Sequence, residues 1–221
     1  MDLKELKLKN LGIIKENFGK IYSFVDFGNV NYWFEYDIRD GDNNDLPAGS
    51  KLIVDVERLA NFLNLFSEHK RFYFGLDPKN RKSFHIVVKA RSFFNQTITK
   101  PIQKIRHYLK DIESKNITRP VGEDLQGRYV YIPKCNFDVE ICIDAIRLID
   151  KYETFCLFSG DADFAALVEF LRGKGKKVIL FSAGYVSHWL TDKADLNVNA
   201  QKIKKDITFI KQKSRLLKAR F

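Results

Sequence analysis

Apolar residues along the chain gather in short runs and in longer stretches with helical spacing. Four runs are mostly apolar and too short for helices, as is typical of strands buried on both faces of a parallel sheet. They are residues 21–26 (IYSFVD), 71–76 (RFYFGL), 154–159 (TFCLFS) and 177–182 (KVILFS). Helical periodicity marks residues 55–66, 78–91, 137–150 and 164–174. This alternation predicts a doubly wound α/β domain with a mostly parallel sheet between two helical layers.

The remaining segments carry weaker patterns. Residues 96–105 and 128–132 alternate like strands, and the charged stretch between them is expected to be a loop. Residues 37–50 (DIRDGDNNDLPAGS) predict a loop, and they lack the spacing and terminal Glu of an EF-hand. We therefore expect a lead-in or short helix at 1–20, one domain at 21–198, and a separate C-terminal element at 199–221.

That C-terminal element combines helical periodicity with positive charge. Its apolar residues Ile203, Ile207, Ile210 and Leu217 are at helical spacing. Eight basic residues accompany one acid, Asp206. The basic residues are Lys202, Lys204, Lys205, Lys211, Lys213, Arg215, Lys218 and Arg220. The pattern predicts a basic helix, which either packs as an ordinary C-terminal helix or also contacts phosphates, and its apolar face could support a homodimer.

Net charge and cysteine content limit the expected partners and cellular location of the protein. The formal charge of +10 favours a polyanionic partner such as nucleic acid, although a lysine-rich surface can also have no specific partner. The three cysteines show no zinc spacing and no even pairing. The N-terminus has no apolar leader, and no run approaches about 18 apolar residues. A cytoplasmic protein without a membrane segment is the expectation.

Four aspartates are predicted to meet at one edge of the sheet. Asp26 ends the first buried strand, and Asp161 and Asp163 directly follow the third. Asp138 begins the helix that leads into the third strand. Doubly wound folds bind their ligands beyond the carboxyl ends of the parallel strands. Four converging carboxylates repel one another unless a cation neutralises them, and Mg²⁺ or Mn²⁺ with oxygen ligands suits phosphodiester hydrolysis.

Each of these aspartates also has an ordinary structural reading. An Asp at a strand end often forms a turn, so Asp26 alone says little. Asp138, Asp161 and Asp163 could serve as helix caps or first-turn residues. It is the set of four, at the edge where such folds bind ligands, that favours a metal site.

The same residues resemble the motifs of a known family. Residues 26–29 (DFGN) are similar to an opening Asp-x-x-Asn, and residues 137–139 (FDV) with Asp144 resemble a Val-Asp-Val motif followed by a second Asp. Residues 159–164 (SGDADF) match Ser-Gly-Asp-x-Asp-Phe, the most specific element, and residues 187–195 echo Ser-x-x-Leu-x-x-x-Ala-Asp. In this order they resemble the NYN domain family, the LabA-like branch of PIN-like nucleases.

The resemblance implies a PIN-like, Mg²⁺-dependent ribonuclease, with RNA ahead of DNA as substrate. Asp26, Asp138, Asp161 and Asp163 would be the catalytic and metal-binding acids. The further residues of the expected site are Asn29, Lys134 and Ser159 for substrate, with Asp144 and Ser187 as weaker members. The family often has Lys three positions before the helix Asp, whereas here Cys135 stands there and Lys134 lies one position earlier.

Aromatic residues offer base-stacking surfaces. Trp33, Phe34 and Tyr36 follow the first acidic turn, and Trp33 is the one we assign to substrate binding. Basic and aromatic residues also mix in residues 77–127, as in single-stranded RNA sites or in solvated helices over a core. Two other functions compete with the nuclease: a catalytically inactive nucleic-acid-binding module of the same fold, and a phosphatase, whose Asp-x-Asp is missing after the first strand.

Overall fold

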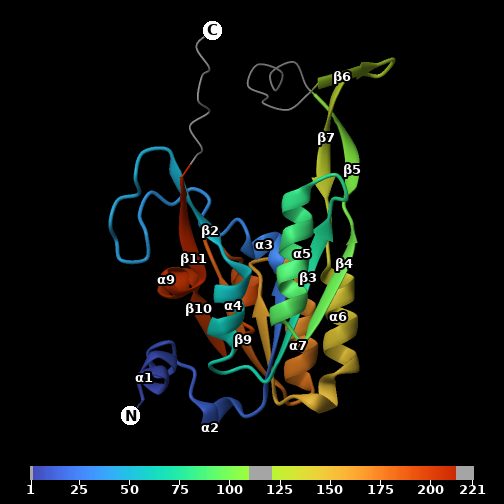
Figure 1. Cartoon of the computed structure of the whole chain (residues 1–221). Coiled ribbons are helices and arrows are strands. Elements are labelled where there is room, and N and C mark those ends of the chain that lie inside the picture. Colours follow the sequence, from blue (N-terminus) through green and yellow to red (C-terminus); the bar gives the residue numbers. More distant parts are fainter. Residues whose placement is uncertain (1, 110–120, 213–221) are drawn as a thin grey trace.

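The computed structural model describes residues 2–109 and 121–212, and a six-stranded parallel sheet forms its centre (Figure 1). The strand order is β10-β9-β8-β1-β3-β4. Its strands are β1 (Ile21–Asp26), β3 (His69–Leu76), β4 (Gln96–Pro101), β8 (Thr154–Phe158), β9 (Lys177–Ser182) and β10 (Leu196–Asn199). All five neighbouring pairs are parallel, which confirms the doubly wound α/β fold.

The strand order reverses between β1 and β8. From β1 the chain builds outward through β3 to β4, then returns to β8 on the other side of β1 and builds outward through β9 to β10. Parallel strands place their carboxyl ends at one edge, so residues following β1 and β8 meet at this switch point.

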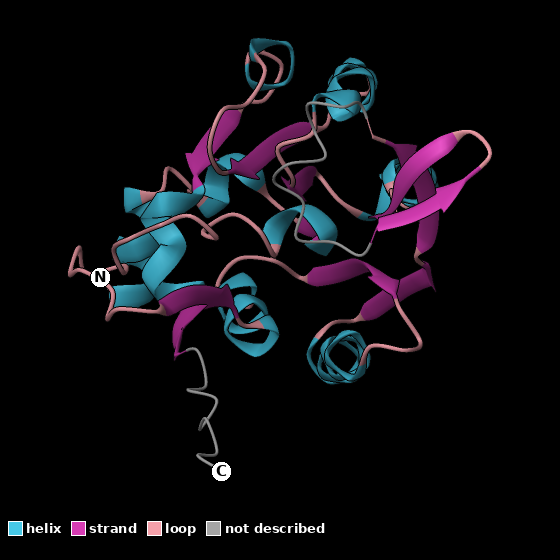
Figure 2. Cartoon of the chain, turned by 90° about the horizontal axis from the view of Figure 1, so that it is seen from above, coloured by secondary structure: helices cyan, strands magenta, loops and turns pink. Residues whose placement is uncertain are grey.

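Helices cover both faces of the sheet (Figure 2). One face carries α4 (Val56–Leu63) and α5 (Arg81–Phe93), together with the two N-terminal helices α1 (Leu3–Asn10) and α2 (Lys15–Phe18). The other face carries α6 (Asp138–Arg147), α7 (Ala165–Gly173) and α8 (His188–Thr191). Strand β8 is buried at every position because both layers cover it, which explains its unbroken apolar sequence. No helix within residues 2–109 and 121–212 combines the length and apolarity that a bilayer span requires.

The C-terminal segment is not the continuous helix that its sequence pattern predicts. After a 3₁₀ turn at Ala200–Ile203, only α9 (Lys204–Ile207) is α-helical, and β11 (Thr208–Gln212) then pairs with β2 (Ser50–Val54). The helix prediction is therefore wrong for residues 208–212. Thr208, Phe209 and Ile210 suit a strand, and β2 offers them a pairing partner. Leu217 and the rest of residues 213–221 lie outside the described residues.

The segment 96–105 is also divided. Strand β4 ends at Pro101, and β5 (Gln103–Tyr108) then leaves the main sheet to pair with β7 (Gly127–Lys134). A third strand, β6 (Val121–Asp124), completes a small antiparallel sheet in the order β5-β7-β6. The tight turn between β6 and β7 ends at Gly127, whose φ of 125° is a conformation that other residues rarely adopt.

Candidate metal centre

Three carboxylates converge at the switch point of the sheet. Asp138, Asp161 and Asp163 each place a carboxylate oxygen within 4.8 Å of the others. Asp138 is the first residue of α6, and the two others lie in the loop and 3₁₀ turn that follow β8. Asp163 is exposed and the other two are partly buried. The group is thus held by two separate segments and open to solvent on one side.

Asp26 lies beside this group of three. Its carboxylate accepts a hydrogen bond from the Ser159 hydroxyl at 3.2 Å and one from the Asn29 backbone N–H at 3.4 Å. The pKa of Asp26 is raised to about 6, first by burial and then by the negative charges of Asp138 and Asp161, while those two hydrogen bonds act in the opposite direction. Asp26 therefore interacts with this group through its charge, although it is not one of the three that converge. We call Asp26, Asp138, Asp161 and Asp163 together the acidic edge.

Asp138 experiences the same electrostatic conflict. Burial raises its pKa, and the charges of Asp161 and Asp163 add to the effect. A side-chain hydrogen bond from Asn136 to the carboxylate lowers the pKa of Asp138 in part, and the Asn136 side-chain oxygen separately accepts the Asp138 backbone N–H at 2.8 Å. A site in which carboxylates are crowded and partly desolvated favours a bound cation.

Two of these aspartates also shape the backbone. Asp26 caps α3 (Phe27–Val30), and Asp161 caps the 3₁₀ turn at Ala162–Phe164 by accepting the Asp163 N–H at 3.0 Å. The capping role considered for Asp161 is therefore present, and Asp26, considered as a turn former, also caps a helix. Asp138 differs, because Phe137 occupies the cap position and Asp138 stands in the first turn. Its carboxylate is left free of a capping bond.

Ser159 and Asn29 connect the two strand ends. The buried Ser159 hydroxyl donates to Asp26 and accepts the Asp161 N–H at 3.3 Å. The Asn29 side-chain oxygen accepts the Gly160 N–H at 3.2 Å and the Trp33 indole N–H at 2.8 Å. These bonds tie the loop after β1 to the loop after β8. They give both residues, which the sequence analysis assigned to substrate, partners within the protein.

Trp33 is held against the core instead of standing free. Its ring stacks on Phe158 with centroids 6.0 Å apart and an interplanar angle of 19°. The neighbouring Phe34 is buried, whereas Tyr36 is 90% exposed. One face of the indole is thus occupied by the protein, and Tyr36 is the fully accessible ring of the three aromatics after the first acidic turn.

A lysine that the sequence patterns did not single out lies next to Asp138. The Lys100 ammonium is 2.7 Å from Glu140 and 4.7 Å from the Phe137 ring centroid, and its charge lowers the pKa of Asp138. Lys134 is exposed at the end of β7. Lys100 lies near the carboxyl end of β4, and the parallel pairing of β4 with β3 brings that end to the acidic edge. This position is the signal that could have identified Lys100.

Sequence and structure comparisons agree with this geometry. The sequence model of the NYN domain family matches residues 38–201, about three quarters of the chain. The chain belongs to the NYN domain family. The matched region contains Asp138, Asp161 and Asp163 and starts after Asp26 and Asn29. The assignment of Asp26 and Asn29 to the site of this NYN domain is therefore supported by the hydrogen bonds described above and not by the family match.

Two individual proteins are similar to this NYN domain. The low amplitude and bright protein LabA of Synechococcus elongatus is 32% identical over 75 residues, which cover 34% of this chain and 40% of LabA. The match thus spans less than half of the length of LabA. A crystal structure of a protein of unknown function from Vibrio parahaemolyticus superposes with a TM-score of 0.57 at 23% identity. It covers 86% of this chain and 96% of the other, and it supports the fold.

Two residues expected as weaker members of the site have structural partners elsewhere in the NYN domain. Asp144 is 2.6 Å from the Arg71 guanidinium and accepts the Tyr73 hydroxyl at 2.8 Å. Six residues along α6 separate it from Asp138, so it faces these partners and not the acidic edge. Ser187 caps the short helix α8 by accepting the Trp189 N–H at 3.2 Å.

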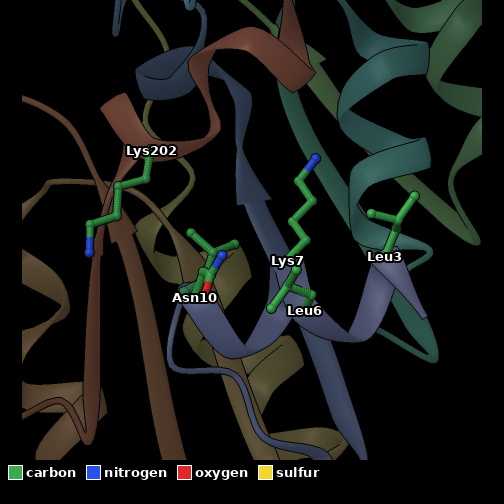
Figure 3. A pocket seen from close by; sticks show the side chains of 6 residues that line it. Leu3, Leu6, Lys7, Asn10 and Lys202 are labelled. Atoms are coloured by element: carbon green, nitrogen blue, oxygen red, sulfur yellow. The ribbon is translucent and has the colours of Figure 1, made fainter. Parts of the chain in front are cut away.

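A cavity of about 410 Å³ lies beside α1, apart from the acidic edge (Figure 3). Its lining residues are Leu3, Leu6, Lys7, Asn10, Leu11 and Lys202. None of them carries a carboxylate. The cavity therefore lacks the donor set of a divalent metal site.

Proposed function

We propose that this protein is a metal-dependent ribonuclease that hydrolyses phosphodiester bonds of single-stranded RNA. The observation that carries the proposal is the convergence of Asp138, Asp161 and Asp163 within 4.8 Å at the switch point of a parallel sheet. Membership of the NYN domain family, which belongs to the PIN-like nucleases, supports it.

The donor set fits Mg²⁺ or Mn²⁺. All three converging groups offer carboxylate oxygens, the ligands that hard divalent cations prefer, and no thiol or imidazole belongs to the group. Burial raises the pKa values of Asp26 and Asp138, and the charges of neighbouring aspartates add to it, so a bound cation would offset both effects. Asp138, Asp161 and Asp163 would hold the cation, with Asp26 as a fourth acid alongside. When bound, such a cation supplies the charge that polarises a phosphoryl group and lowers the pKa of an attacking water.

The remaining residues of the site have supporting tasks. Ser159 and Asn29 fix the two loops, so the acids are preorganised before substrate arrives. The Lys100 ammonium is close enough to the acids to attract a phosphate oxygen of the substrate, a role first assigned to Lys134. The net charge of +10 favours a polyanion over a small neutral substrate.

The second candidate is a nucleic-acid-binding module without catalysis. It would retain the basic surface without requiring a metal. The intact group of three carboxylates favours the nuclease, because a pure binding module gains nothing from concentrated negative charge against a polyanion.

Cleavage of labelled single-stranded RNA and DNA, each with Mg²⁺, Mn²⁺ or EDTA, tests the proposal. We expect RNA cleavage that requires the metal and stops in EDTA. The double variant Asp161→Asn, Asp163→Asn, purified in parallel, controls for contaminating nucleases. Tight RNA binding without cleavage under any condition would overturn the nuclease in favour of the binding module.

A further inference from the structure

The small sheet β5-β7-β6 extends from the acidic edge of the main sheet (Figure 1). Its first strand follows β4, which carries Lys100, and β7 ends at Lys134, shortly before Asp138 opens α6. Both covalent connections of this sheet thus lead directly to residues of the candidate metal centre. A ligand lying on it would be delivered to the acids.

One face of this small sheet carries tyrosines and an arginine. Arg106 pairs with Tyr131 and Tyr108 pairs with Tyr129 across the β5-β7 ladder, so their side chains share a face. The Tyr129 ring centroid lies 5.9 Å from that of Tyr108 and 5.5 Å from that of Tyr131. The Arg106 guanidinium lies 4.8 Å from the Tyr129 centroid. We call these four residues the tyrosine face.

The tyrosine face is exposed and not part of a core. Tyr108 is 37% exposed and Tyr131 is 44% exposed, and every residue of β5 is exposed. The opposite face carries aliphatic Ile105, Val130 and Ile132, as residue alternation requires. Aromatic rings are thus concentrated on one face of this sheet, and that face is open to a ligand.

Residue alternation places the tyrosine face on the side of the sheet that carries α6. Ile98 packs with the core cluster under α6, and Lys100 reaches Glu140 on α6. The Ile102 N–H still donates to the Leu76 carbonyl at 3.0 Å, so the chain remains extended between β4 and β5. Even-numbered residues from Ile98 onward therefore continue on the α6 side, which places Arg106 on the same side of the molecule as Asp138.

The chemistry of the tyrosine face matches a single-stranded nucleic acid. Unpaired bases stack on exposed aromatic rings, while cations follow the phosphate backbone. Lys104 shares the face by alternation, and Arg106 is held in place by Asp124 at 3.0 Å and by the Tyr131 hydroxyl at 3.2 Å. Arginine stacked on a ring also offers its own planar surface to a base.

We infer that the tyrosine face binds single-stranded RNA by base stacking on Tyr108 and Tyr131 and guides the strand to the acidic edge. This inference rests on the proposed function for its substrate class, but binding can be measured without cleavage.

Adjacent positions in β7 provide a matched test. Tyr131 and Ile132 are exposed to similar extents, 44% and 36%, on opposite faces of one strand. We would compare Tyr131→Thr with Ile132→Thr, both compatible with a strand, and add Tyr131→Phe, which keeps the ring. Fluorescence anisotropy with a labelled single-stranded RNA, in EDTA to prevent cleavage, reports Kd for the full chain.

We expect Tyr131→Thr to weaken RNA binding about tenfold, since one stacked base is lost. Ile132→Thr should bind as the wild type does, Tyr131→Phe should bind more tightly than Tyr131→Thr because it keeps the ring, and duplex RNA should bind the wild type more weakly than the single strand. Equal Kd values for Tyr131→Thr and Ile132→Thr, or preference for the duplex, would overturn the inference. If Tyr131→Thr weakens RNA binding but the wild type does not cleave RNA, only the proposed nuclease activity is refuted. If the wild type cleaves RNA but Tyr131→Thr leaves the Kd unchanged, only the inference about the tyrosine face is refuted.

Discussion

The acidic edge and the tyrosine face differ in how they are held. At the acidic edge, the ends of two buried strands are joined by hydrogen bonds through Ser159 and Asn29, so the carboxylates stand on a rigid base. The tyrosine face stands on a thin sheet whose first strand is exposed throughout. Chemistry demands fixed distances, whereas stacking on bases tolerates adjustment. This difference agrees with the two steps that we propose, catalysis at the acidic edge and capture on the tyrosine face.

The two regions also differ in charge balance. On the tyrosine face, Arg106 pairs with Asp124, which also accepts the Tyr108 hydroxyl at 3.0 Å. At the acidic edge, burial raises the pKa values of Asp26 and Asp138, and the charges of neighbouring aspartates add to the effect. The charges of the tyrosine face are paired within the protein, whereas the carboxylates of the acidic edge would be stabilised by a bound cation. This contrast can be tested residue by residue.

Removal of the two acids that follow β8 should have the largest effect. Asp161→Asn combined with Asp163→Asn should lower RNA cleavage by roughly 10²–10³-fold or more, because preorganised charge at the reacting group is lost. RNA affinity should stay the same or become tighter, since two negative charges have gone. Cleavage rates and anisotropy on the same preparations check both expectations. Unchanged cleavage would remove these residues from the site.

Asp144 should prove structural. Asp144→Ala leaves the Arg71 guanidinium, only 13% exposed, without its carboxylate, so we expect the free energy of unfolding to fall by about 3 kcal/mol. The exposed Asp150 offers a matched control, and Asp150→Ala should change it by less than about 0.5 kcal/mol. Urea unfolding measures both variants. Normal stability with lost Mg²⁺ affinity would instead return Asp144 to the metal site.

The buried negative charge of Asp26 should lower the free energy of unfolding when no metal is bound. Its pKa of about 6, against an ordinary 3.8, means that the folded state binds more protons than the unfolded state between these values. Stability therefore falls as the pH rises through this window, and the cost is complete above it. Asp26→Asn should raise the free energy of unfolding in EDTA by about 1–3 kcal/mol at neutral pH and by much less near pH 4.

Thermal unfolding of Asp26→Asn at both pH values checks this expectation. Asp192, which is exposed, supplies the control, and Asp192→Asn should leave the melting temperature unchanged. Destabilisation by Asp26→Asn at neutral pH would show that its hydrogen bonds to Ser159 and Asn29 outweigh the burial of its charge.

The smallest effect is expected from the lysines, and it should differ between Lys100 and Lys134. Lys100→Ala should raise KM for RNA about tenfold, because a charge-assisted contact to phosphate is lost next to the acids. Lys134→Ala, at an exposed position, should change KM by no more than about twofold. Steady-state cleavage at two salt concentrations measures both. The opposite order would restore Lys134 as the phosphate ligand.

Local sequence patterns predicted five of the six strands of the central sheet and did not single out β10. Buried parallel strands such as β1 and β8 require continuous apolar runs, and few other structures produce them. The pattern failed at residues 208–212, where the helical spacing of Ile203, Ile207 and Ile210 continues into a strand. The difference arises because β2, more than 150 residues earlier, supplies the partner, and a local pattern contains no information about it.

For the site, the sequence by itself predicted that Asp26, Asp138, Asp161 and Asp163 meet at one edge of the sheet, and the structure brings Asp138, Asp161 and Asp163 together. Only the tertiary structure decided the rest. It placed Asp26 beside the group, directed Asp144 to Arg71, brought Lys100 to Asp138 and gathered the tyrosine face. The physical reason is range: strand ends follow from neighbouring residues, whereas contacts between distant strands depend on register and packing, which emerge only when the whole chain has folded.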